Sequence, residues 1–169
     1  MDWSRVYFGK KNKIRNVDGA IVYEKSVLKN SWQILNPLNW SLLPSLIKIY
    51  SGKNLSFRDY LNIFIRTILT NNLSKKHDIN TTSFYQSDTS FHLLLCKELW
   101  GKSISIILTV FGEIYDLADY LIPKKNLLLE MLFKSDAVIS SSCYCAESFN
   151  LIGNEGQIDV IYVGVSVSR

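Results

Sequence analysis

The sequence contains few of the residues that build disulfide frameworks and metal sites. Its three cysteines are an odd number, and the opening residues Met1–Arg5 lack the apolar run of a secretory signal. Cys143 and Cys145 are separated by one residue and have no companion Cys/His pair, which disfavours a metal site and favours small apolar helix positions. We therefore predict reduced thiols in a cytoplasmic protein, because disulfides persist mainly in oxidising compartments.

Several common catalytic motifs are also absent. The chain has no Walker loop, GxGxxG, HExxH or GxSxG, and the missing GxGxxG disfavours a nucleotide-dependent oxidoreductase. The two histidines, His77 and His92, have no obvious partner and are predicted to be structural or to lie at the solvent edge. The acids Glu113, Asp116 and Asp119 follow a predicted strand. They fit either a base or sugar-hydroxyl acceptor, or an ordinary acidic helix start.

Positive charge is concentrated at the amino end of the chain. The net charge is +4. Residues 1–15 contain five basic residues and one acid, which accounts for the whole excess. We expect a basic, flexible and solvated tail here, with a patch for anionic lipid or phosphate as the alternative. The balanced remainder gives no indication of a nucleic-acid surface.

No stretch of the sequence is predicted to span a membrane. The longest uncharged stretch, residues 30–47, contains two prolines, three Asn and three Ser. Residues 56–69 form the clearest helix, with Ser56 and Asp59 as a capping box. Its apolar stripe is interpreted as core, with a face lying on a membrane as the alternative. The stripe consists of Phe57, Tyr60, Leu61, Phe64, Ile65, Ile68 and Leu69, and basic residues nearby are Lys48, Lys53, Arg58, Arg66, Lys75 and Lys76.

Residues 81–165 alternate between strand and helix patterns. This alternation predicts an α/β fold, a Rossmann-like parallel sheet with flanking helices. In such a sheet, functional groups gather in the loops after the carboxyl ends of the strands. Residues 19–30 fit either a helix after a glycine turn or a short strand. The predicted strands are 81–88, 104–112, 137–142 and 158–165, and the predicted helices are 91–100, a segment opened by Pro123 that includes 126–133, and 143–152.

The helix ends in this half carry recognisable signals. Gly101 and Gly153 stand where helices are expected to end, and Ser141 or Ser142 is predicted to cap the helix over 143–152. No internal repeat or low-complexity linker marks a boundary, so we expect the whole chain to form a single domain.

The last half of the chain resembles a known enzyme family. The stretch ISIILTVFGE, followed later by KSDAVISSSCYCAESFNLIGNEGQIDVIYVGVSVSR, is similar to the amino-terminal half of the glycosyltransferase family 4 enzymes. These are retaining, metal-independent transferases of the GT-B fold. Ala137–Ser142 and Ile158–Val165 match two strands of the family, and Asn154–Gln157 occupies the turn before the second. The resemblance covers residues 80–169.

The resemblance also implies site residues. It places Gly19, within the stretch NVDGAI, in the family's donor loop. It places Gly112, Glu113 and Ser141 along the cleft that binds substrate. The catalytic residue is unknown, because the family's histidine falls at Phe111, which cannot donate a hydrogen bond to a sugar.

The activity that the resemblance implies belongs to bacterial surface polysaccharide synthesis, such as lipopolysaccharide O-antigen or capsule. The chain would be the acceptor-side domain, binding a glycan or lipid-linked sugar, with a nucleotide-sugar as donor and no metal or other cofactor. The family's donor domain, with its Glu-x7-Glu motif, does not follow Arg169. We therefore expect a truncated enzyme, or one half that works with a separate donor-domain chain and is weak or inactive alone.

The resemblance further implies peripheral contact with the inner face of the cytoplasmic membrane, and no nucleic-acid partner. The alternative to a transferase is a non-catalytic Rossmann-like module that binds another protein, or the product of a truncated gene.

Overall fold

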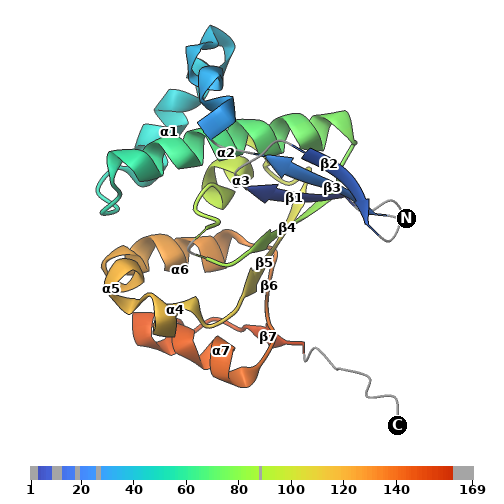
Figure 1. The fold of residues 1–169 in the computed structure, drawn as a ribbon. Helices are drawn as coiled ribbons and strands as arrows, with labels where there is room; N and C mark the ends of the chain where they lie inside the picture. Colours follow the sequence, from blue (N-terminus) through green and yellow to red (C-terminus); the bar gives the residue numbers. More distant parts are fainter. Residues whose placement is uncertain (1–3, 9–12, 18–19, 26–27, 88, 162–169) are drawn as a thin grey trace. The chain divides into compact units, whose positions relative to one another are not determined.

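The chain divides into two compact units, residues 1–51 with 55–78 and residues 52–54 with 79–169. The computed structural model describes residues 4–8, 13–17, 20–25, 28–87 and 89–161 (Figure 1). We predicted a single domain, because the sequence contains no low-complexity linker between these two units. Each unit is described by itself below.

The first unit opens with a three-stranded mixed sheet. Its strands are β1 (Ser4–Phe8), β2 (Lys13–Val17) and β3 (Ala20–Lys25), in the order β1-β3-β2. β3 is parallel to β1 and antiparallel to β2. Where we expected a solvated tail, the structure has two strands, because β-branched and aromatic residues such as those of SRVYF favour extended, paired backbone. Of the two alternatives for residues 19–30, the strand is realised over 20–25.

The helical elements of the first unit are η1 (Leu28–Leu35), η2 (Pro37–Leu42), α1 (Leu43–Tyr50) and α2 (Phe57–Lys76). The predicted capping box starts α2. The Ser56 hydroxyl accepts a hydrogen bond from the Asp59 amide at 3.2 Å, and the Asp59 carboxylate accepts one from the Ser56 amide at 2.9 Å. These bonds satisfy two amides that the helix leaves without internal partners.

The apolar stripe of α2 is core, as predicted. Its central side chains are buried: Phe64, Ile65, Ile68 and Leu69. Phe57, at the amino end, is instead exposed. Among the described residues, no helix is both long and apolar enough to cross a membrane.

The second unit is built on the predicted parallel sheet. Its strands are β4 (Thr81–Tyr85), β5 (Ser105–Val110), β6 (Ala137–Ser140) and β7 (Asp159–Val160), in the order β4-β5-β6-β7. Each neighbouring pair is parallel. The fold is therefore a mixed α/β, Rossmann-like arrangement of a parallel sheet with flanking helices, as predicted (Figure 1). The predicted last strand beyond Ile161 lies outside the described residues.

The helices of this unit connect its strands and end where the sequence predicts. Gly101 and Gly153 end α3 and η4 with positive φ, and the Ser142 hydroxyl caps α7 by accepting a bond from the Cys145 amide at 3.2 Å. The elements are α3 (Leu93–Trp100), α4 (Glu113–Asp116), α5 (Ala118–Leu121), η3 (Ile122–Lys124), α6 (Lys125–Lys134), α7 (Cys143–Glu147) and η4 (Ser148–Ile152).

One face of the sheet holds the core of the second unit. Ile106, Leu108 and Val110 of β5 are fully buried, whereas Ile107 between them is only half-buried. The strand is therefore more deeply buried on one face than on the other. The alternation arises because successive side chains of a strand point to opposite faces.

An ion pair fixes the amino end of β6 to its neighbours. The Asp136 carboxylate accepts hydrogen bonds from Lys97 Nζ and from the Ile106 amide, both at 2.7 Å. The bond from Lys97 is the main cause that lowers the pKa of Asp136 below its ordinary value, and the bond from the Ile106 amide adds to it. Partial burial opposes these effects. The charged form of Asp136 thus favours the folded state.

We predict that Asp136→Asn destabilises the protein at neutral pH by up to about 1 kcal/mol, since the pair is partly exposed. A folded pKa below the ordinary value stabilises the protein above about pH 4 and loses that contribution as the pH falls through the folded pKa. Urea unfolding at a series of pH values measures the difference, with Asp119→Asn as the exposed control. A difference that persists unchanged at low pH would contradict the assignment.

Candidate functional site

The candidate site lies at the carboxyl edge of the parallel sheet. The register pairs Tyr85 with Thr109, and Val110 with Ser140, so β4, β5 and β6 end side by side. The residues that follow these strands therefore meet at one edge. Of the four residues predicted to bind substrate, Gly112, Glu113 and Ser141 are brought to this edge. Gly19 lies outside the described residues.

Glu113 connects two of the loops at this edge. It is 4% exposed. One carboxylate oxygen accepts a hydrogen bond from the Phe111 amide at 2.7 Å, and the other accepts one from the Ser87 amide. Both oxygens are thus bound to backbone after β5 and after β4. Glu113 therefore holds the two loops of this edge together. It is also the first residue of α4, as the helix-start interpretation predicted.

Two buried hydroxyls near this edge lack hydrogen-bond partners within the described chain. They are Ser87 Oγ, just after β4, and Thr109 Oγ1, on β5. Ser87 is 1% exposed. Buried polar groups without partners are uncommon in folded proteins and need a specific explanation, of which a role in a site is one.

Gly112 brings the loop after β5 against α7. Its backbone is left-handed, with φ of 78°, a conformation that costs other residues roughly 1–2 kcal/mol. A Cβ built on it would lie 3.2 Å from Cys145 Sγ and 3.3 Å from Cys145 Cα. Glycine is therefore required here for both its backbone conformation and its small size.

The serine that ends β6 and the two that follow it shape the neighbouring turn. The Ser140 hydroxyl is buried and donates to the carbonyls of Val110 at 3.3 Å and Ser142 at 3.1 Å. Ser142 is the cap of α7, which settles the predicted choice between Ser141 and Ser142. Ser141 lies half-buried between them. Two of the three hydroxyls are thus engaged in holding the turn.

Exposed aromatic rings gather at the same edge. Tyr85, the last residue of β4, stacks beside Phe111, with centroids 6.4 Å apart and planes 18° apart. Tyr115 of α4 stacks on Tyr144 of α7, with centroids 4.7 Å apart. All four rings keep substantial exposure, from 39% for Tyr115 to 65% for Tyr144. Sequence reasoning missed Tyr85, Tyr115 and Tyr144. Tyr115 and Tyr144 do follow predicted strand ends closely, but this position alone does not reveal that the two rings stack.

The titratable groups near this edge offer little for acid–base chemistry. Asp116 and Asp119 are exposed, whereas the Glu113 carboxylate accepts backbone hydrogen bonds at this edge. His92 is buried, and its ring meets Phe84 edge-on at 5.1 Å, as predicted for a structural histidine. Among the residues that the structure describes, no three His, Cys, Asp or Glu side chains are placed to hold a metal ion.

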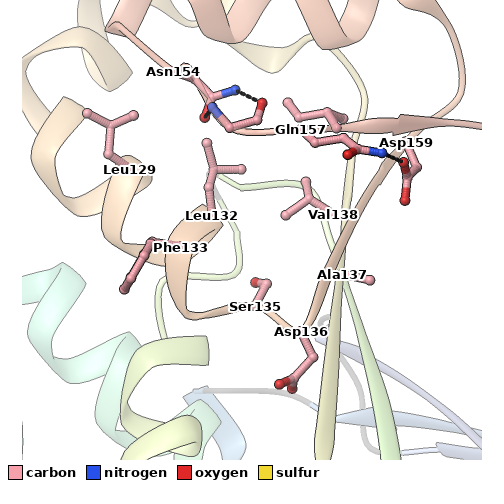
Figure 2. Close-up of a pocket in the computed structure, with 12 residues that line it drawn as sticks. Leu129, Leu132, Phe133, Ser135, Asp136, Ala137, Val138, Asn154, Gln157 and Asp159 are labelled. Atoms are coloured by element: carbon pink, nitrogen blue, oxygen red, sulfur yellow. Dashed lines mark hydrogen bonds between the residues drawn. The ribbon is translucent and has the colours of Figure 1, made fainter.

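A separate hollow of about 500 Å³ lies at the opposite, amino edge of the sheet (Figure 2). Leu132 and Val138 are among its apolar lining residues. Polar residues at its rim form hydrogen bonds with one another. The Asn154 side-chain amide donates to the Gly156 carbonyl at 2.9 Å, and the Gln157 side-chain amide donates to the Asp159 carboxylate. Because ligands of open parallel sheets bind at the carboxyl edge, we assign the candidate site to the carboxyl edge.

Comparisons with known proteins do not identify this chain. No model of a protein family matches it, and no curated protein gives a significant match.

We predict that Gly112→Ala destabilises the protein more than Gly153→Ala does. Both glycines are left-handed, with φ of 78° and 82°, but a Cβ at Gly153 would meet nothing within 4 Å. The backbone cost of about 1–2 kcal/mol is therefore shared, and the excess at Gly112 measures the contact with Cys145. Denaturant unfolding of the two variants provides the comparison. Equal losses would show that α7 is not packed against Gly112.

We also predict that Glu113→Gln lowers the unfolding free energy by about 1–3 kcal/mol, because the glutamine amide group would face a backbone N–H that needs an acceptor. Asp116→Asn, on the same short helix but exposed, is the control and should change stability little. A Glu113→Gln protein as stable as the wild type would show that the carboxylate does not hold the two loops.

Proposed function

We propose that this chain is an acceptor-side, sugar-binding domain of the kind found in glycosyltransferase family 4 enzymes, acting in bacterial surface polysaccharide synthesis. Two independent features support the proposal. Residues 80–169 resemble the amino-terminal half of that family, and residues 81–160 form an all-parallel sheet, consistent with a Rossmann-like fold. The acceptor would be a glycan or a lipid-linked sugar.

The observation that carries the proposal is the set of exposed aromatic rings at the carboxyl edge. One side of a sugar ring presents mainly C–H groups, which are apolar, while its hydroxyls point outward. Flat aromatic faces pack against the C–H side of a sugar, and nearby polar groups bind its hydroxyls. The stacked pairs Tyr85–Phe111 and Tyr115–Tyr144 provide the faces, and the tyrosine hydroxyls provide polar groups on three of the rings.

In this proposal the chain orients an acceptor hydroxyl and does not itself supply a base. Phe111 stands at the family's histidine position and has no group that transfers a proton. Glu113 is bound at both oxygens by backbone amides. The nucleotide-sugar and the stabilisation of its diphosphate leaving group would belong to a separate donor domain, without a metal ion. This chain is expected to contribute by positioning the acceptor hydroxyl rather than by acid–base catalysis.

Binding without catalysis is the second candidate function. The same observations favour it, since Phe111 and the bound Glu113 leave the edge equipped for recognition but poorly equipped for proton transfer. The two candidates agree on a ligand at the carboxyl edge and differ in whether a donor domain completes an enzyme.

We predict that methyl hexopyranosides bind weakly at the carboxyl edge and receive saturation from its aromatic protons in saturation-transfer NMR. Tyr144→Ala and Phe111→Ala should each weaken binding several-fold, because each removes one exposed ring face. Phe133→Ala removes an exposed ring at the opposite edge and is the matched control. The absence of transfer to any sugar of a gluco, galacto and manno panel, or an equal effect of the control, would overturn sugar binding at this edge.

The same titrations with UDP-glucose and GDP-mannose separate the acceptor role from a donor role. The acceptor-side proposal expects the sugar to bind and the nucleotide to add no affinity. A nucleotide-dependent gain that survives Phe111→Ala would contradict the proposed division between acceptor and donor domains.

A further inference from the structure

The first unit exposes a concentration of large apolar side chains in residues 28–51 and 55–58, called here the 28–58 segment. These residues span η1, η2, α1 and the first two residues of α2. Leu38 and Phe57 are each 83% exposed. The full set of exposed large apolar residues is Trp32, Leu35, Leu38, Trp40, Leu43, Ile47 and Phe57. Soluble proteins seldom gather so many such residues on one short stretch unless the surface binds something.

The charges of the 28–58 segment all have one sign. Its residues in the first unit include Lys29, Lys48 and Arg58, and no Asp or Glu. Lys29, Lys48 and Arg58 are exposed. An apolar surface flanked by basic side chains is complementary to an anionic lipid surface.

The exposed side chains stand on a backbone that is held in place. The Trp40 indole donates to the Ile34 carbonyl at 2.7 Å, and the Asn39 amide donates to the Gln33 carbonyl at 2.8 Å. Leu46 and Tyr50 of α1 are buried, so the segment has an inner apolar side as well as an outer one. The exposed residues are therefore a second apolar surface and not a core that failed to pack.

The lengths of the elements suit the surface of a bilayer. η1, η2 and α1 contain 8, 6 and 8 residues, whereas a spanning helix needs about 20. Tryptophan is enriched at the boundary between lipid and water, because its ring is apolar while its N–H is polar. The alternative membrane face expected for residues 56–69 is ruled out for most of α2, whose stripe is core.

We propose that the 28–58 segment binds the surface of an anionic lipid bilayer, inserting its exposed tryptophan and leucine side chains between headgroups while its basic side chains contact lipid phosphates. This proposal does not rest on the proposed sugar-binding function, because the lipid surface lies in the first unit and the sugar site lies in the second. A second copy of this chain or another protein on the same surface would be a different outcome, and the absence of any acid in the segment favours lipid.

The test is sedimentation of the full chain with phosphatidylcholine vesicles that contain or lack phosphatidylglycerol. Binding is expected to the anionic vesicles, weaker binding to the neutral ones, and a loss of the difference at high salt. Trp32→Ala with Leu38→Ala should weaken binding about a hundredfold, since each buried apolar side chain contributes about tenfold. Trp40 is kept because its indole holds η1 to η2.

Lys29→Gln with Lys48→Gln should reduce the preference for anionic vesicles by about fivefold for each residue. Phe133→Ala, an equally exposed aromatic in the other unit, is the matched control and should bind as the wild type does. Circular dichroism melts establish whether each variant is folded. If the Trp32→Ala with Leu38→Ala variant does not fold, the lysine variants still test the proposal.

Two results would overturn the proposal. One is no vesicle binding by the folded wild type. The other is binding that the Phe133→Ala control loses as strongly as the segment variants do. Self-association in analytical ultracentrifugation that Trp32→Ala with Leu38→Ala abolishes, without vesicle binding, would assign the surface to a second copy of the chain instead.

Discussion

The carboxyl edge of the second unit depends on one buried carboxylate. Parallel strands bring their carboxyl ends together, but the loops that follow have amides with no ladder to pair with. Glu113 accepts bonds from two of these amides, one after β4 and one after β5. This fixes the loop that carries Phe111 and the turn at Gly112, and through Gly112 the approach of α7. The exposed rings of the edge are held on loops that this carboxylate organises.

The same interaction decides what chemistry the edge can perform. A carboxylate is useful as a base only if an oxygen is directed toward substrate. At Glu113 both oxygens are directed toward backbone, so the residue that looks most catalytic in sequence is structural. The groups that remain available to a ligand are aromatic faces and tyrosine hydroxyls. Such groups can recognise and orient a ligand but do not transfer protons in the way a free carboxylate would, which is the basis of the proposed binding role.

Much of the second unit could be predicted because its signals are local. The β-branched run of β5, the glycines at 101 and 153 and the serine cap of α7 each act within a few residues. The role of Glu113 could not be predicted, since its partners Ser87 and Phe111 lie on different loops that only the folded sheet brings together. The aromatic pairs were missed for the same reason: Tyr115 and Tyr144 are far apart in sequence.

The first unit resisted prediction for a different reason. Its apolar residues serve two surfaces, and composition cannot distinguish an inward residue from an outward one. In the sequence, α2 is the more suggestive amphipathic helix, yet its stripe is core, whereas the proline-interrupted stretch before it carries the exposed tryptophans. Periodicity identifies a buried face where a regular helix exists, and η1 and η2 are too short and too tightly wound to show one.

The two proposals become linked through the chain itself, whatever the arrangement of the units. A lipid-linked sugar diffuses in the plane of a bilayer, so a protein in bulk solution meets it rarely. Holding the first unit on that surface keeps the second unit within a short tether of the same surface, which raises the effective concentration of site and acceptor without any added contact at the site. A weak, aromatic sugar site is then sufficient, because the lipid contact supplies the affinity that the edge itself does not need to provide.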